Sequence, residues 1–322
     1  MIANSGEYRK KNGQRGCVMM NNFIFENKTK VYFGKGGVKE YLGGLLANFG
    51  ETVMLAYGGG SIKCNGVYDE IMGILNAQGK CVVEFSGIMP NPTYAKVQEG
   101  AKLARENHVD LILAVGGGSV SDCCKVISGA FDTLSHAMET YFGKPDENNL
   151  SDDINEAVMR SVIRNIRILL TDPENYDARS ELAQASAMAE NGVLKIGKVT
   201  DFQAHQIQHQ LGAYTDCNHG AGLAVIHPVL YRHIYKSGMA RFTRWAQNVW
   251  GIATKGSDGE TAAGIDALAA FIKEIGLPTS FAELGIPADT DFRAVADSTN
   301  ITAGCCKKLT RDEICEILQE CL

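Results

Sequence analysis

The chain has 322 residues, of which 45% are hydrophobic and 21% are charged, and its formal net charge is −6. This composition is ordinary for a folded globular protein and excludes extensive disorder, and the length allows two domains. The negative charge disfavours nucleic acid as a partner, because a phosphate backbone attracts basic surfaces. No run approaches the roughly 20 apolar residues of a membrane span, so we expect no membrane partner.

Residues 1–21 are predicted to form a disordered extension. The chain begins MIANSGEYRKKNGQRG, which is polar and basic and lacks the apolar region of a secretory signal. The ten cysteines form no C-x-x-C pattern. We therefore expect reduced thiols and a cytoplasmic location.

Residues 22–128 are predicted to form an α/β dinucleotide-binding domain. Short β-rich runs alternate there with helical runs, a pattern typical of βαβ units and a parallel sheet. Only four strands are predicted, which makes a thin sheet and suggests an incomplete domain. The predicted strands are Lys30–Phe33, Thr52–Tyr57, Cys81–Phe85 and Leu111–Val115, and the helices lie near Val38–Phe49, Gly66–Gln78 and Thr93–Asn107. Asn91 is expected to cap the third helix, with Pro92 in its first turn.

Residues 129–322 are predicted to form an all-α domain. No convincing strand is found after Gly129, and apolar residues recur at helical spacing. Ser151 is the expected start of the first long helix, and Gly192 and Gly212 are expected helix ends. The helical runs are 151–170, 177–193, 201–212, 222–235, 238–252, 261–275 and 310–320.

Two glycine-rich turns follow predicted strands and indicate a nucleotide site. Glycines let backbone N–H groups approach a phosphate, and two such turns at the carboxyl ends of parallel strands define a place for a dinucleotide. A single turn of this kind is weak evidence, because it also suits a simple strand-to-helix connection. The candidate residues are Gly58, Gly59, Gly60 and Ser61 in the first turn, and Gly116, Gly117, Gly118, Ser119 and Asp122 in and after the second.

The end of the second predicted strand favours NADP(H) over NAD(H). NAD-specific sites usually place an acid there, which bonds the ribose 2′-hydroxyl and repels a 2′-phosphate. Here the position is Gly58, and Lys63 follows shortly after. The alternative for Lys63 is a solvated lysine at a helix start.

Acidic and histidine side chains at helical spacing predict a metal centre. Asp132 precedes His136 by four residues, His205 precedes His209 by four, and His219 follows. Residues four apart lie on one face of a helix. One carboxylate and three imidazoles can hold a metal ion with room for a substrate. His209 is also compatible with a surface histidine.

These motifs together resemble the iron-containing (group III) alcohol dehydrogenases, in particular their NADPH-dependent butanol dehydrogenases. The most specific segments are YGGGSIKCNG (57–66), GIMPNP (87–92), AVGGGSVSD (114–122), GAFDTLSHAMETY (129–141), NYDAR (175–179) and HQIQHQLGAYTDCNHG (205–220). The resemblance implies that Asp132, His136, His205 and His219 bind the metal and that His209 lies near the substrate. It also implies Fe²⁺, although an N₃O ligand set does not itself distinguish Fe²⁺ from Zn²⁺, and a homodimer or larger homo-oligomer.

The sequence departs from this family between residues 128 and 129. The resemblance implies several dozen residues between a segment like KVIS (125–128) and one like GAFDTLSH (129–136), but here the two are joined. If 119–142 form one helix, Asp132 lies about 20 Å from the second glycine turn. Gly129 is the expected break in such a helix. Since hydride transfer requires near contact of the reacting carbons, we expect impaired activity.

The sequence therefore predicts a metal-dependent, NADP(H)-linked alcohol dehydrogenase or aldehyde reductase for small primary alcohols and aldehydes such as butanol and butanal. The metal would polarise the aldehyde oxygen, and His209 would relay a proton. The alternative is an inactive truncated homologue that binds metal or pairs with a full-length partner. A glycerol dehydrogenase or a dehydroquinate-synthase-like cyclase is a third alternative, and the few basic residues in 129–222 disfavour the cyclase.

Overall fold

The computed structural model describes residues 24–27, 29–88, 94–116, 123–145, 148–200, 202–302 and 306–322. The chain divides into two compact units, of which one contains Lys28–Val126 and the other Ile127–Leu322 with the N-terminal residues. The fold class predicted from the sequence is confirmed, because an α/β unit is followed by a helical one. The domain boundary between residues 128 and 129, and the roles assigned to the two domains, stay predictions.

Within its described residues, the N-terminal unit contains a parallel sheet of three strands in the order β2-β1-β3. They are β1 (Thr52–Tyr57), β2 (Cys81–Phe85) and β3 (Leu111–Val115), and all three match the predicted bounds. β1 pairs in parallel with both neighbours, so that Val53 lies opposite Val82 and Leu111. The apolar sequence TVMLAY fits this central position, because the strand is buried on both faces.

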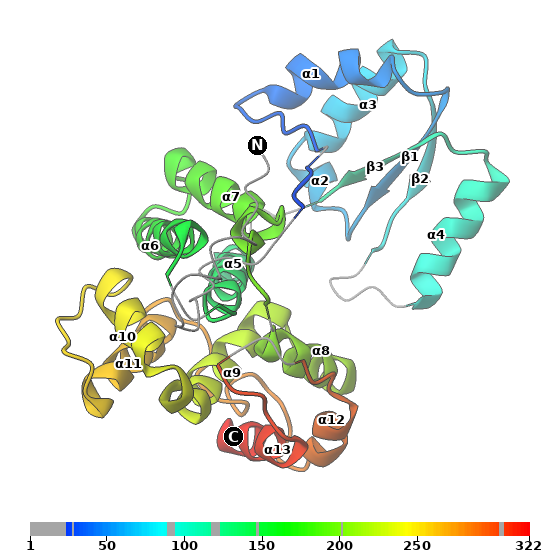
Figure 1. Ribbon diagram of the computed structural model, residues 1–322. Coiled ribbons are helices and arrows are strands. Elements are labelled where there is room, and N and C mark those ends of the chain that lie inside the picture. Colours follow the sequence, from blue (N-terminus) through cyan, green and yellow to red (C-terminus); the bar gives the residue numbers. More distant parts are fainter. Residues whose placement is uncertain are drawn as a thin grey trace, which may run out of the picture. The chain divides into compact units, whose positions relative to one another are not determined.

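Helices cover both faces of the sheet (Figure 1). On one face, Leu46, Leu55 and Leu75 belong to a core formed with α1 and α3; on the other, Met54 and Phe85 pack against α4. These contacts explain why the apolar residues of β1 face alternately to the two sides. The helices are α1 (Gly37–Leu46), α2 (Ser61–Cys64), α3 (Val67–Ala77) and α4 (Tyr94–Glu106).

The predicted first strand, Lys30–Phe33, is wrong. The segment has no regular secondary structure, and Val31 and Phe33 are 71% and 58% exposed. β-branched and aromatic residues favour a strand only where a neighbouring strand supplies hydrogen bonds and a surface to pack on. Asn91 and Pro92 lie outside the described residues.

The C-terminal unit consists of helices that pack in neighbouring pairs. α6 packs on α7, α8 on α9, α10 on α11 and α12 on α13. The helices are α5 (Cys123–Tyr141, which belongs to this unit from Ile127 on), α6 (Leu150–Thr171), α7 (Tyr176–Glu190), α8 (Gln203–Thr215), α9 (His219–Ile234), α10 (Met239–Asn248), α11 (Asp258–Glu274), α12 (Phe292–Ser298) and α13 (Arg311–Glu320), with 3-10 turns η2 (Val193–Lys195) and η3 (Tyr235–Gly238). No helix in the described parts of the chain is long and apolar enough to cross a membrane.

Several predicted helix boundaries in this unit are wrong. α6 begins after Asn149, whose side chain and that of Asp152 form a capping box, so Ser151 lies inside the helix. α8 continues past Gly212 to Thr215. α5 runs through Gly129 without a break, because one glycine weakens a helix by only about 1 kcal/mol relative to alanine.

A buried ion cluster joins α6 to α10 and to the segment before α8. Asp152 contacts Lys198 and lies 3.0 Å from Arg241, and all three side chains are almost fully buried. Lys198 and Arg241 both donate to the carbonyl oxygen of Tyr141, at 2.9 and 3.0 Å. The cluster therefore satisfies charges that would otherwise be costly to bury.

Candidate metal centre

Three helices supply the predicted metal ligands. Asp132 and His136 are on α5, His205 is on α8, and His219 is the first residue of α9. The four-residue spacing places Asp132 and His136 on the same face of α5. Residues far apart in the sequence thus come together at one place.

Asp132, His205 and His219 form the most compact part of this group. Asp132 Oδ1 lies 3.2 Å from His205 Nε2 and 3.5 Å from His219 Nε2, and one ligand atom from each of the three residues lies within 4.8 Å of the others. Ligands around a tetrahedral metal with bonds near 2.1 Å are about 3.4 Å apart. The donor set and its spacing therefore fit a divalent cation.

His136 lies at the edge of this group. Its Nε2 atom is 3.7 Å from Asp132 Oδ1 and only 2.9 Å from Glu190 Oε1. The imidazole ring lies 4.2 Å from that of His205, measured between ring centroids. Of the four predicted ligands, three converge and the fourth is held by a carboxylate that the sequence prediction did not include.

Two further side chains orient the histidines. Glu139 contacts His205 Nδ1 and accepts hydrogen bonds from the backbone N–H groups of Ala204 (2.6 Å) and His205 (3.2 Å). Gln208 Oε1 contacts Nδ1 of His219. Such partners leave Nε2 of each ring directed at a metal. Sequence reasoning missed both, although Glu139 follows Asp132 by seven residues and so shares its helix face.

The start of α9 is fixed by the segment that precedes Asp132. Asn218 caps α9 by accepting from the N–H of Ala221 at 3.0 Å, and Ser128 Oγ donates to Asn218 Oδ1 at 2.6 Å. A Cβ atom at Gly220 would lie 2.2 Å from the carbonyl oxygen of Ser128, so only glycine allows this approach. Ser128 thereby helps to set the position of His219.

The charged groups of the centre shift one another's pKa values. Burial alone would raise the pKa of Asp132, but hydrogen bonds with His205 and His219 hold it well below its usual value. Burial opposes the charged form of His205, yet its contacts with Asp132 and Glu139 raise its pKa to about 9. Burial and the neighbouring His205 lower the pKa of His136 to about 4. The group thus contains carboxylates that remain charged and attract cations.

His209 lies at the exposed side of the centre. Its ring stacks on that of His219, with centroids 5.3 Å apart and an angle of 22° between the planes. Burial and the nearby His219 lower its pKa. A neutral imidazole at this position can accept a proton near pH 7.

A second histidine, His227, is fully buried on α9. Its Nε2 atom lies 2.6 Å from Ser135 Oγ, and neither side chain is exposed. Burial lowers its pKa to about 4. The lowered pKa favours the neutral form of His227, which lies in the core against Ser135.

The first glycine turn has the open backbone that a dinucleotide needs. Gly60 has a φ of 104°, which disfavours any other residue. A Cβ atom at Gly59, Gly60 or Gly116 would meet no described atom within 4 Å, whereas one at Gly58 would lie 3.2 Å from the carbonyl oxygen of Ile88. Ser61 begins α2. Of the second turn, Gly117, Gly118, Ser119 and Asp122 lie outside the described residues.

Lys63 is part of a polar cluster on the α/β unit. Its Nζ atom is 3.4 Å from Glu84 Oε2 and 4.4 Å from the centroid of the Tyr68 ring. The hydroxyl groups of Tyr57 and Tyr68 donate to the same carboxylate at 2.5 and 2.6 Å. Glu84 of β2 thus brings an acid beside Tyr57, the last residue of β1, and the sequence prediction for the end of that strand did not include it.

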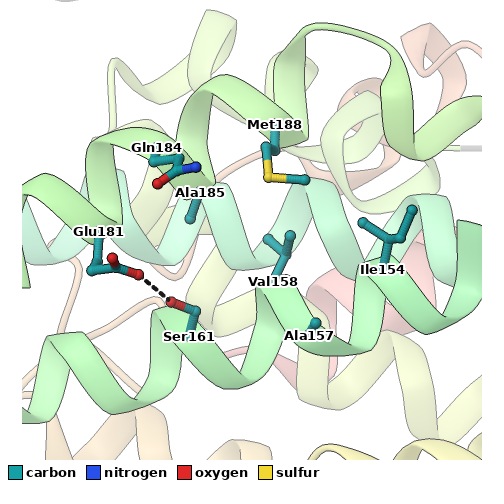
Figure 2. A pocket seen from close by; sticks show the side chains of 8 residues that line it. All are labelled: Ile154, Ala157, Val158, Ser161, Glu181, Gln184, Ala185 and Met188. Carbon is teal, nitrogen blue, oxygen red and sulfur yellow. Dashed lines mark hydrogen bonds between the residues drawn. The ribbon is translucent and has the colours of Figure 1, made fainter. Parts of the chain in front are cut away.

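A separate cavity of about 200 Å³ lies between α6 and α7 (Figure 2). One hydrogen bond crosses it, from Ser161 Oγ to Glu181 at 3.5 Å. Its lining is mainly aliphatic and contains none of the predicted site residues: Ile154, Ala157, Val158, Ser161, Glu181, Gln184, Ala185 and Met188.

Comparison with known proteins is consistent with this geometry. Residues 126–322 match the Fe-containing alcohol dehydrogenase family, C-terminal, and residues 28–157 match iron-containing alcohol dehydrogenase. The chain belongs to the iron-containing alcohol dehydrogenase family, a family of oxidoreductases.

Individual relatives cover nearly the whole chain. The probable NADH-dependent butanol dehydrogenase 2 of Bacillus subtilis is 31% identical over 94% of this chain and 100% of its own length. The NADPH-dependent aldehyde reductase YqhD of Escherichia coli is 28% identical over 83% and 90% of the two chains. The crystal structure of NADH-dependent butanol dehydrogenase A from Thermotoga maritima superposes with a TM-score of 0.87 at 27% identity, covering 94% of this chain and 99% of that chain.

Proposed function

We propose that the protein is a metal-dependent, NADP(H)-linked alcohol dehydrogenase or aldehyde reductase for small primary substrates such as butanol and butanal. The observation that carries the proposal is the convergence of Asp132, His205 and His219 within 4.8 Å. The names of the relatives support the substrate class, since they include butanol dehydrogenases and an aldehyde reductase.

The proposed ligands are Asp132, His205 and His219, with His136 as the fourth. A divalent cation bound there would act as a Lewis acid that polarises the aldehyde oxygen. The family name favours Fe²⁺, and the N₃O donor set would also accept Zn²⁺. Glu139 and Gln208 would keep His205 and His219 oriented during turnover.

His209 is the proposed proton carrier. Its exposed position beside His219 would let it exchange a proton between the substrate oxygen and solvent. We expect His209→Ala to lower kcat by about 100-fold, the lower end of the range for general acid–base groups, with unchanged metal content. Steady-state kinetics with metal analysis of the same samples tests this, and an unchanged kcat would remove His209 from the mechanism.

The two glycine turns are the proposed dinucleotide contacts. The residues are Gly58, Gly59, Gly60 and Ser61 in the first turn, and Gly116, Gly117, Gly118, Ser119 and Asp122 in and after the second. Lys63 is the proposed contact for a 2′-phosphate. The proposed preference for NADP(H) rests on Lys63 beside the first turn, since the nearby carboxylate of Glu84 already accepts hydrogen bonds from Tyr57 and Tyr68.

Removal of Lys63 tests the cofactor preference. Lys63→Ala is expected to lower kcat/KM for NADPH by about 10-fold, the value of one exposed charge-assisted contact, and to leave that for NADH nearly unchanged. Parallel assays with the two cofactors provide the comparison. An equal loss with both would indicate a general defect, and a native preference for NADH would contradict the proposal.

The decisive experiment is an assay of the purified protein with NADPH and butanal after loading with Fe²⁺ or Zn²⁺. Metal-dependent consumption of NADPH is expected. Turnover that persists after complete removal of metal would contradict the proposed mechanism.

A second candidate function is binding of metal and cofactor without catalytic turnover. In this case a segment missing near residues 128 and 129 would have removed the activity. It is supported by the alignment with the Bacillus subtilis relative, which extends over 392 positions although this chain has 322 residues. At least 70 positions of the alignment therefore lack a residue of this chain. Stoichiometric metal and NADPH binding without NADPH consumption would favour this alternative.

A further inference from the structure

The contact between His136 and Glu190 lies beside the proposed metal centre. His136 Nε2 is 2.9 Å from Glu190 Oε1, which is shorter than its 3.7 Å distance to Asp132 Oδ1. Glu190 is the last residue of α7, where the helix dipole disfavours a negative side chain. His136 supplies this carboxylate with a partner from outside its own helix, at hydrogen-bond distance.

The contact uses the nitrogen atom that a cation would need. Because a carboxylate can only accept, His136 donates through Nε2–H, and a protonated ring nitrogen has no lone pair for a metal. The Nδ1 atom of His136 is buried without a hydrogen-bond partner among the described residues. The ring thus makes its one short polar contact with Glu190 rather than with the centre.

We propose that Glu190 competes with the metal ion for His136 and so lowers the affinity of the centre for a divalent cation. This inference rests on the proposed metal site. With four protein ligands on the ion, His136 would have to leave Glu190 and present the lone pair of Nε2. Nε2 would then release its proton and Nδ1 would take one up, so that the ring stays neutral. While the contact holds, three of the four proposed ligands remain for the ion, namely Asp132, His205 and His219.

Two effects of Glu190 oppose each other. Its charge attracts a cation, but the side chain is 53% exposed, and such screened charges change binding by less than about 5-fold. Breaking a hydrogen bond to a charged group costs about 10-fold or more in an equilibrium constant. Competition for His136 therefore outweighs attraction, and removal of the carboxylate tightens metal binding.

The test is a double-mutant cycle on the full-length chain with Co²⁺ as the probe. Co²⁺ dissociation constants are measured by chelator competition for the wild type, Glu190→Leu, His136→Ala and the double variant, and absorption spectra report the coordination of the ion. Glu190→Leu is expected to bind Co²⁺ about 3- to 10-fold more tightly. In the His136→Ala background the same change is expected to give no gain. Glu181→Leu, on the same helix, is the control and is expected to match the wild type.

The outcomes separate the inference from the proposed function. If Glu190→Leu weakens Co²⁺ binding, or tightens it equally without His136, the competition is wrong, whereas the metal centre stands as long as His205→Ala abolishes binding. If neither His205→Ala nor Asp132→Ala affects Co²⁺ binding, the proposed metal centre itself is wrong, and the inference with it.

Discussion

His205→Ala is expected to cause the largest loss of function of any single change in the chain. His205 lies 3.2 Å from Asp132 Oδ1 and is held by Glu139 from the other side of its ring. Loss of a partner such as Glu139 typically reduces metal affinity or activity by 10–100-fold, so loss of the ligand itself is expected to reduce both by more than about 100-fold. Metal analysis after dialysis and steady-state kinetics measure the two effects.

Two further variants make this prediction specific. Glu139→Gln keeps the side-chain shape. It is expected to lower metal affinity or activity by about 10–100-fold, which is less than the loss expected for His205→Ala. His233→Ala removes a histidine of α9 that is paired with Glu320 at 3.1 Å, and it is expected to retain full metal content. A His205→Ala protein with wild-type metal stoichiometry would rule out the proposed centre.

Asp152→Ala is expected to have the largest effect on stability. Asp152 is fully buried against Lys198 and Arg241, and its removal leaves two buried cations without their carboxylate. Breaking a buried pair in this way costs about 3–5 kcal/mol. Its loss also removes half of the capping box at the start of α6. The free energy of unfolding from urea titration is the appropriate measurement.

The neighbouring acid provides a matched control. Asp153 is adjacent in sequence and pairs with Arg244 at 2.5 Å, but its side chain is 62% exposed. Asp153→Ala is therefore expected to lower the free energy of unfolding by less than about 1 kcal/mol. Equal effects of the two substitutions would mean that burial of the ion cluster contributes nothing to stability.

The sequence predicted those parts of the fold that depend on local pattern. The bounds of β1, β2 and β3 match because each is a short apolar run between turns. The segment 30–33 has the same composition and is not a strand, since strand formation depends on a neighbour that local sequence does not reveal. α12 was not predicted because its seven residues carry too short a pattern.

Helical spacing and family resemblance predicted the ligand residues of the candidate site but not the side chains that contact them. Asp132, His205 and His219 do converge. The carboxylates of Glu139 and Glu190 were missed for different reasons. Glu139 is on the same helix as Asp132, so the seven-residue spacing could have predicted that the two side chains lie on the same face. Glu190 reaches His136 from a different helix, and only tertiary structure brings them together.

The neutral His227 in the core makes the protein sensitive to mild acid. In the unfolded chain this imidazole has an ordinary pKa of 6.5, whereas in the folded state it is about 4. Between these values the unfolded chain binds the proton and the folded chain does not, so the stabilisation present above pH 6.5 declines as the pH falls toward 4. Weakly acidic buffers between these two pH values are therefore expected to lower the free energy of unfolding through His227.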